Sequence, residues 1–174
     1  TISGDRLKGT GRFTESLANW STKRRWVAEA FEALEAAGYT PRSAYTLVRN
    51  PERTTFVYTD RLWDGSDLAA IGVASFGHVN GVHMQNHDQW GAYAAAVERG
   101  ELPLARAYRP TADERLIREF VLQLKRGSLK PSYFAERYGV DVLDRFAEPL
   151  ARLVGEGLAV IRPEAVTLSR QALL

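Results

Sequence analysis

The sequence predicts an α+β protein, in which mixed strands and helices are followed by a helical region that ends in a hairpin. Three observations predict this class. An amphipathic helix runs from an N-cap at Ser21 or Thr22 to Gly38, with apolar side chains at helical spacing. Residues 67–77 form a nearly continuous apolar run, which is typical of a strand buried on both faces. The last third contains three helical patterns and then two short strand patterns.

The region before the last third alternates strand and helix patterns. Residues 1–20 are polar and rich in glycine and serine, and predict a loop with a short helix near 15–19. The following elements are strands within 39–49, over 54–59 and over 67–77, a helix over 88–99, and a linker over 101–110 that crosses the surface. We place a domain boundary after Tyr108, which divides the chain into residues 1–108 and 109–174.

The last third carries stronger local signals. Thr111 and Glu114 form a capping box in front of a helix that ends at Gly127. A short helix is predicted over 132–138 and a third helix over 141–154, which Pro149 should kink or split. A hairpin with strands over 158–161 and 166–168 follows. Three helices and a hairpin in this order are typical of a winged-helix domain.

Composition excludes several classes of site. The 174 residues include no cysteine, so this chain cannot form disulfides, zinc thiolate sites or cysteine-held iron–sulfur clusters. No apolar run approaches the roughly 18 residues of a membrane helix, and no secretory signal is visible, so we expect a cytoplasmic protein without a membrane partner. Because the chain starts at Thr1 with a weakly patterned stretch, we expect a segment of a longer protein.

The stretch IGVASFGHVNGVHMQNH, residues 71–87, contains all three histidines of the chain. Three imidazoles can form an open zinc site. The spacing of His78, His83 and His87 fits no metal motif, and no carboxylate stands at helical spacing to act as a base. We therefore interpret them as polar loop histidines and expect no metal site. The alternative is a structural or heme-carrying domain, with these histidines as axial candidates.

The same stretch has two interpretations for its small residues. Gly72, Gly77 and Gly81 match neither the dinucleotide fingerprint nor the phosphate-binding loop. They either serve close packing and turns, or, together with Ala74 and Ser75, they leave space for a ligand at a strand end.

Aromatic residues near this stretch also have two interpretations. Most of them should be core residues, and Tyr58 and Trp63 could instead line a pocket. The candidates are Phe56, Tyr58, Trp63, Phe76 and Trp90. We predict no catalytic residue, because the aspartates of the LWDGSD turn form no acid–base pair and no serine lies in a nucleophile elbow.

Nucleic-acid binding is disfavoured by charge. The formal net charge of the chain is +2, and residues 111–174 contain 10 lysines and arginines against 9 carboxylates. The third helix of this region carries four acidic and two basic residues over 141–156. A recognition helix needs a positive face to contact phosphates, so we do not expect nucleic acid as a partner.

Three motifs follow one another along the chain, WDGSDLAAIGVASFG, VHMQN and GEGLAVIRPEAVTLS. Together they resemble the C-terminal half of radical S-adenosylmethionine (SAM) enzymes of the oxygen-independent coproporphyrinogen III oxidase type, a superfamily that includes heme chaperones and class C methyltransferases. WDGSDLAAIGVASFG resembles the Asp-Leu-x-Gly-x-Gly-x-x-Ala/Ser segment of the family, with Ala70 where glycine is common. VHMQN resembles its Tyr-x-Asn segment, and GEGLAVIRPEAVTLS resembles its wing, with Ser169 in place of threonine. The resemblance extends from Trp20 to nearly the end of the chain.

The resemblance implies a fold, cofactors and partners. Residues 1–108 would be the closing β/α part of a partial (β/α)6 barrel, and residues 109–174 a winged-helix-like domain. The intact enzyme would use SAM and a [4Fe–4S] cluster, which the missing N-terminal barrel part would hold through three cysteines. By resemblance, the cofactor-binding residues would be Gly72, Val73, Ala74, Ser75 and Phe76. Tyr58 and Trp63 would contact the substrate, a tetrapyrrole or a molecule to be methylated.

The segment alone should then be inactive. The second hypothesis is a binding module of winged-helix type without enzymatic activity.

Overall fold

The structure is a computed structural model that describes residues 18–173, so the loop predicted over residues 1–20 lies almost wholly outside the described part. The elements are α2 (Trp20–Ala36), β1 (Thr40–Ser43), β2 (Thr46–Val48), α3 (Val57–Trp63), β3 (Phe76–Val79), β4 (Val82–Asn86), α4 (Trp90–Glu98), β5 (Leu104–Tyr108), α5 (Ala112–Leu124), β6 (Ser128–Leu129), α6 (Pro131–Tyr138), α7 (Val142–Arg145), α8 (Ala147–Gly155), β7 (Ala159–Arg162), β8 (Ala165–Leu168) and α9 (Arg170–Leu173). None of the helices described is both long and apolar enough to cross a bilayer.

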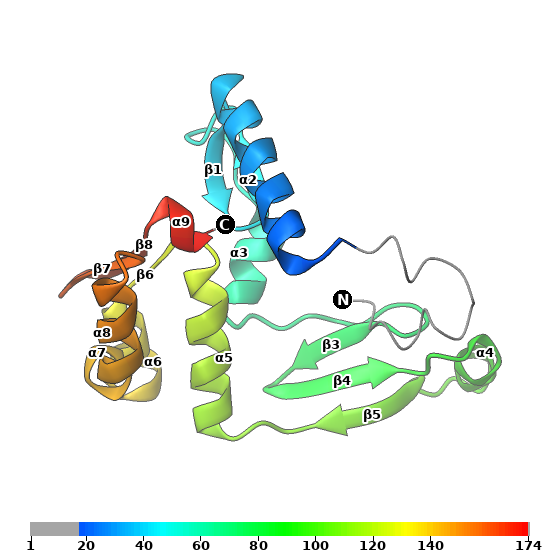
Figure 1. Ribbon diagram of the computed structural model, residues 1–174. Helices are drawn as coiled ribbons and strands as arrows, with labels where there is room; N and C mark the ends of the chain where they lie inside the picture. The colour runs from blue at the N-terminus through cyan, green and yellow to red at the C-terminus, as the bar shows by residue number, and fades with distance from the viewer. Residues whose placement is uncertain (1–17, 174) are drawn as a thin grey trace.

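The predicted α+β class is confirmed, and the strands form small open sheets. Within the described part, these are the hairpin β1–β2 and two three-stranded sheets, ordered β3–β4–β5 and β6–β8–β7, and all strand pairs are antiparallel. Helix α5 stands between the β3–β4–β5 sheet and the helices α6–α8 (Figure 1). It therefore contributes side chains to both halves of the chain.

The main core lies in the second half. Phe120 on α5 packs against Phe134 on α6 and Phe146, with ring centroids 5.8 and 4.4 Å apart. The whole cluster comprises Leu116, Phe120, Leu129, Phe134, Val142, Leu150 and Val166. Because α5, α6, α7, α8 and the β6–β8–β7 sheet each place an apolar side chain here, residues after 110 form a self-consistent packing unit.

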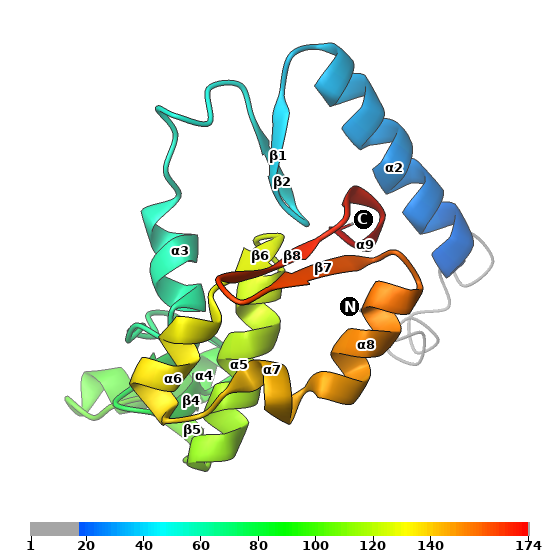
Figure 2. The same ribbon diagram turned by 90° about the vertical axis from the view of Figure 1, so that its left-hand side faces the viewer.

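The first half leaves much apolar surface uncovered. Of 19 exposed large hydrophobic residues in the described part, 15 precede residue 109. On α2 the apolar stripe is only partly used: Phe31 is buried, whereas Trp26, Val27 and Leu34 are exposed. Figure 2 shows α2 and the β1–β2 hairpin projecting from the rest of the molecule. An apolar stripe of this kind normally packs against another element.

Local capping and breaking signals in the second half are confirmed. The Thr111–Glu114 capping box begins α5. Gly127, predicted to end this helix, follows α5 with φ +83°. The predicted third helix is divided into α7 and α8 around Phe146, with Pro149 in the first turn of α8, and β7 and β8 form the predicted hairpin. On α2, however, the N-cap is Asn19, whose side chain accepts the Thr22 N–H, rather than Ser21 or Thr22.

Three predictions in the first half are wrong. In place of the strand expected over 54–59, residues 54–56 are irregular and 57–59 begin helix α3, because Trp63 and Asp60 gain tertiary contacts that override the strand preference of β-branched residues. The apolar run 67–77 is strand only from Phe76 onward. The surface linker over 101–110 contains β5, which pairs with β4 and satisfies its backbone groups.

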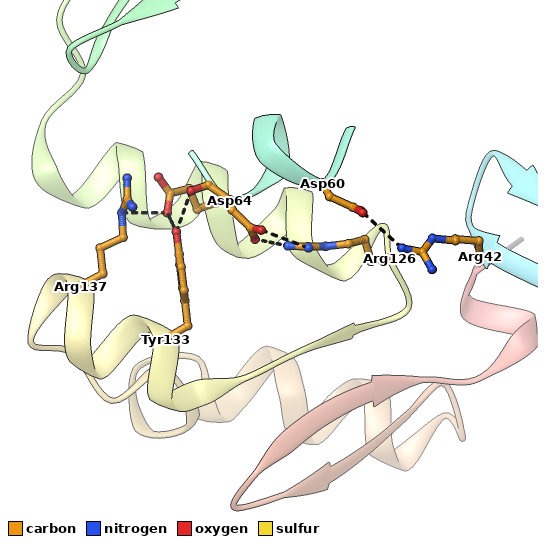
Figure 3. A network of polar contacts seen from close by, with 7 residues as sticks. Arg42, Asp60, Asp64, Arg126, Tyr133 and Arg137 are labelled. Carbon is orange, nitrogen blue, oxygen red and sulfur yellow. Dashed lines mark hydrogen bonds and ion pairs between the residues drawn. The ribbon is translucent and has the colours of Figure 1, made fainter. Parts of the chain in front are cut away.

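The two halves are joined by a buried polar contact under the Asp64–Gly65 turn (Figure 3). Glu119 on α5 is 3% exposed, and its Oε2 lies 2.7 Å from the Tyr133 hydroxyl and 3.3 Å from Arg137 Nε on α6. The Tyr133 hydroxyl also lies 2.9 Å from the Asp64 carbonyl oxygen. Burial raises the pKa of Tyr133 far above its usual value, and the Glu119 carboxylate raises it further, so this hydroxyl stays a donor.

Two ion pairs extend the same contact toward the β1–β2 hairpin. The Asp64 carboxylate pairs with Arg126, just beyond α5. Asp60 on α3 pairs with Arg42 on β1 at 3.2 Å. Helix α3 is therefore fixed at both ends, by the hairpin and by the start of the second half (Figure 3).

Replacing Gly65 by alanine should destabilise the fold by about 2–4 kcal/mol. The residue has φ +74°, and an added Cβ would lie 2.0 Å from Glu119 Oε1, so the buried carboxylate would have to leave its partners. Urea unfolding measures the loss. Gly100→Ala is the matched control, because its φ is +73° but no atom lies within 4 Å of the added Cβ. Equal losses in both variants would contradict the role given to the Glu119 contact.

Candidate functional site

Residues Gly72–Phe76 form a tight turn that leads into β3 rather than the buried strand predicted from their apolarity. Gly72 and Ala74 have φ values of +102° and +59°, which a strand cannot contain. Ser75 Oγ donates to the Ile71 carbonyl oxygen at 2.7 Å and closes the turn. We call residues 71–76 the rim turn. The prediction of a strand fails because these side chain–backbone bonds compete with a sheet ladder.

The rim turn is held mainly by Asn86 and Tyr93, two residues that the pattern of glycines and histidines did not indicate. Asn86 at the end of β4 is 2% exposed, and its side-chain N–H groups donate to the carbonyl oxygens of Gly72 at 3.0 Å and Ala70 at 3.4 Å. The Tyr93 hydroxyl on α4 accepts the Gly72 N–H at 3.2 Å. The backbone of His87 accepts the Ala74 N–H. The turn is thus a defined surface with a fixed backbone.

The side chains at both ends of the rim turn face outward. Ile71 is 86% exposed and Phe76 is 65% exposed. Their exposure overturns the expectation of a segment buried on both faces. Gly72 to Ser75 between them are half-buried.

Next to Phe76, one face of the β3–β4–β5 sheet is hollowed. The register places Phe76 opposite Gln85, and Gln85 opposite Arg106, so these three side chains share a face. A groove of about 180 Å³ runs along it, lined by Phe76, His83, Met84, Gln85, Arg106, Ala107 and Tyr108. Arg106 Nε donates to Gln85 Oε1 at 2.7 Å, which gives the groove one polar edge. The alternation of small and large side chains in LARAY, residues 104–108, is the sequence pattern that could have indicated strand β5.

Tyr58 and Trp63 lie on α3, apart from the groove. Trp63 is 7% exposed and belongs to the interior, whereas the Tyr58 side chain is 64% exposed. Of the other aromatic core candidates, Phe56, Phe76 and Trp90 are exposed. The expected aromatic core around this stretch is therefore wrong for all but Trp63, because the apolar side of this half is left open.

The histidines belong to the sheet rather than to a loop. His78 on β3 and His83 on β4 are directly opposite each other, with ring centroids 4.4 Å apart. His87 follows the end of β4. Across residues 18–173, no three His, Cys, Asp or Glu side chains gather in a group that could hold a metal ion. The β3–β4 ladder fixes the ring pair, and Arg118 on α5 lies near both rings.

Both rings of the pair favour the neutral form. Burial lowers the pKa of His78 below its usual 6.5, and the nearby Arg118 and His83 lower it further. Burial and Arg118 also lower the pKa of His83. A proton added to either ring would stand beside the Arg118 guanidinium in a poorly solvated place.

Replacing Asn86 by alanine should loosen the rim turn and cost about 1–3 kcal/mol, because two carbonyl oxygens lose their buried donor. Amide hydrogen exchange should accelerate in residues 70–75. The exposed Gln89, which caps α4 without a side-chain hydrogen bond, offers the control Gln89→Ala, with a change within about 0.5 kcal/mol. Unchanged exchange in Asn86→Ala would show that the turn is held by its backbone alone.

The histidine pair predicts a loss of stability on acidification. Above pH 6.5 the histidines are largely neutral in both states, and the contribution of the pair is complete. As the pH falls toward the lower folded pKa values, the unfolded chain binds protons first, and unfolding becomes easier by at most about 1.4 kcal/mol per pH unit per histidine. Urea unfolding between pH 7.5 and 5.5 measures this slope. The slope of stability against pH should shrink in the double variant His78→Gln/His83→Gln. It should persist in the control Arg49→Gln, a residue just after β2. An unchanged slope in the double variant would refute the assignment.

Comparison with known proteins supports the fold. No protein-family model and no curated protein sequence matches the chain. Among solved structures it is similar to coproporphyrinogen III oxidase (HemN) of Escherichia coli, described as a radical SAM enzyme. The TM-score is 0.72 at 19% sequence identity, over 92% of this chain and 40% of that chain. The resemblance predicted from the motifs is confirmed at the level of the fold, and the chain spans about two fifths of the length of the protein it matches.

Proposed function

We propose that this chain is the C-terminal portion of a radical SAM enzyme that acts on a tetrapyrrole or transfers a methyl group. The observation that carries the proposal is the fold likeness over 92% of this chain and only 40% of a radical SAM enzyme. The order of the motifs around residues 63–77, 82–86 and 155–169 supports the same conclusion independently of the coordinates.

In this proposal the chain has two parts. Residues 1–108 close the barrel, and residues 109–174 form a winged-helix-like domain. The second assignment is supported by the β6–β8–β7 order, with β6 between α5 and α6 and the β7–β8 hairpin after α8. The first is supported by the exposed apolar surface of α2 and of the β3–β4–β5 sheet, which an adjoining barrel part of the same enzyme would cover.

In this proposal the [4Fe–4S] cluster belongs to the N-terminal barrel part, and this chain contributes to the SAM site. This chain does not fit the [4Fe–4S] cluster, because the sequence contains no cysteine to supply thiolate ligands. SAM fits better at the rim turn, Gly72–Phe76. There the exposed Phe76 and the adjoining groove offer an apolar surface to an adenine ring, and Gln85 and Arg106 offer polar groups. When bound, SAM would supply the reactive group, while the rim turn would orient it.

The substrate contacts are assigned to α3. Tyr58 offers an exposed ring and hydroxyl that a substrate is able to reach, whereas the buried Trp63 would act by holding α3 in place. The protein partner in this proposal is the N-terminal barrel part, and the small-molecule partner is a tetrapyrrole or a methyl acceptor.

A reconstitution experiment tests the proposal. Anaerobic treatment of the chain alone with iron and sulfide should give no [4Fe–4S] absorption, and joining it to a barrel part with three cysteines should give both the cluster and SAM cleavage. A cluster held by this chain alone would refute the division of roles.

Within the joined enzyme, Phe76→Ser should weaken SAM binding about tenfold, since an apolar contact of this size is worth about 1.5–3 kcal/mol. Equilibrium dialysis with labelled SAM measures the affinity. Val97→Ser on α4 is the control, because Val97 is also an exposed apolar residue but lies outside the groove. If the Phe76 variant and the parent bound SAM with equal affinity, the rim turn would not be part of the SAM site.

The order of three helical segments and a hairpin after residue 110 resembles a winged helix and supports a second candidate, a binding module without enzymatic activity. Its α8 carries Glu148 and Arg152, so the charge there offers no basic face to phosphates. Salt-dependent binding of duplex DNA by the chain, in the absence of any barrel part, would favour this candidate over the enzyme.

A further inference from the structure

A polar cavity is lined by His78, whose ring lies beside the groove residue His83. It is enclosed by the turn after α3, the β3–β4 turn, the first turns of α5 and the end of α6. Its volume is about 450 Å³, which falls in the range of small-molecule sites. The lining residues are Gly65, Asp67, His78, Asn80, Gly81, Ala112, Arg115, Glu119, Arg137 and Tyr138.

Two buried nitrogen atoms on its walls have no hydrogen-bond partner among residues 18–173. These are Nδ1 of His78, a residue only 6% exposed, and Nε of Arg115. A guanidinium N–H is always a donor, and a neutral imidazole can carry its proton on Nδ1. Burying such groups without an acceptor costs free energy, so their presence in one cavity indicates a ligand that supplies acceptors.

The carboxylates of the cavity are already engaged. Glu119 is held by Tyr133 and Arg137, and Asp67 accepts the Asn80 N–H at 2.9 Å. The Arg115 guanidinium instead packs on the β3–β4 turn, where a Cβ added at Gly81 would lie 2.9 Å from Nη1. The one positive group without a carboxylate partner in the described part of the cavity wall is therefore also the one with an unused buried donor.

We propose that this cavity binds a small oxyanion, a carboxylate or a phosphate, which accepts hydrogen bonds from Arg115 Nε–H and His78 Nδ1–H. The cavity carries no large aliphatic side chain, so a flat apolar macrocycle does not fit its chemistry. The site is thus separate from the one assigned to SAM and does not depend on the proposed function. A neutral imidazole beside a guanidinium is suited to an anion, since it can donate without adding a second positive charge.

The test uses the 174-residue chain with inorganic phosphate and succinate as probes, and sodium chloride at equal ionic strength as the reference. Either oxyanion should raise the melting temperature in a saturable way. The same titration should move the Gly65 and Gly81 amide resonances and convert the His78 imidazole to its Nδ1–H form in ¹⁵N spectra. Tighter binding of phosphate or of succinate identifies the source of the oxyanion.

Variants separate this site from general salt effects. Arg115→Gln should weaken binding about tenfold or more, because a charge-assisted hydrogen bond is lost. His78→Gln, which keeps a donor, should weaken it less, and the control Arg49→Gln should bind like the parent. The melting temperature without anion shows whether each variant is folded. Absence of a saturable response to both probes, or an unchanged affinity in a folded Arg115→Gln chain, would overturn the proposal.

Discussion

The placement of the two halves of this chain depends on one buried carboxylate. Glu119 projects from α5 against the Asp64–Gly65 turn, and Tyr133 and Arg137 on α6 satisfy it. A buried charge is costly unless each oxygen finds donors, so the turn, α5 and α6 can be assembled in few ways. A glycine is required at the turn, since a side chain at residue 65 would occupy the space of the carboxylate. This contact fixes the orientation of α3, and α3 leads into the rim turn.

Helix α5 also determines which part of one face of the β3–β4–β5 sheet stays open. Its Arg118 lies near the His78–His83 pair, while the remainder of that face, from Phe76 to Tyr108, stays open as the groove. One histidine of the pair, His83, thus lines the apolar groove, and the other, His78, lines the polar cavity. Since Tyr108 also donates to Glu114 at 2.7 Å, the end of β5 is tied directly to the start of the helix.

Sequence patterns predicted the second half better than the first, for a physical reason. The Thr111–Glu114 box, Gly127 after α5 and Pro149 each act on backbone only a few residues away, so their effect depends little on tertiary contacts. In contrast, the apolar run 67–77 is shaped by Asn86 and Tyr93, which lie far along the chain. Strand β5 exists because β4 offers an edge, and α3 because Trp63 finds an interior.

The candidate site follows the same division. The small residues of Gly72–Phe76 indicated a strand, whereas the backbone turns there with positive φ at Gly72 and Ala74, which glycine alone adopts without strain. No local sequence signature marks the remaining residues of the groove, the cavity and the rim turn, namely Arg106, Arg115 and Asn86. The strand register and helix α5 place them there.

Within residues 18–173, the apolar stripe on α2 and the groove beside the rim turn are both uncovered, whereas the main core lies after residue 110. The barrel part in our proposal is the element that would cover these two surfaces.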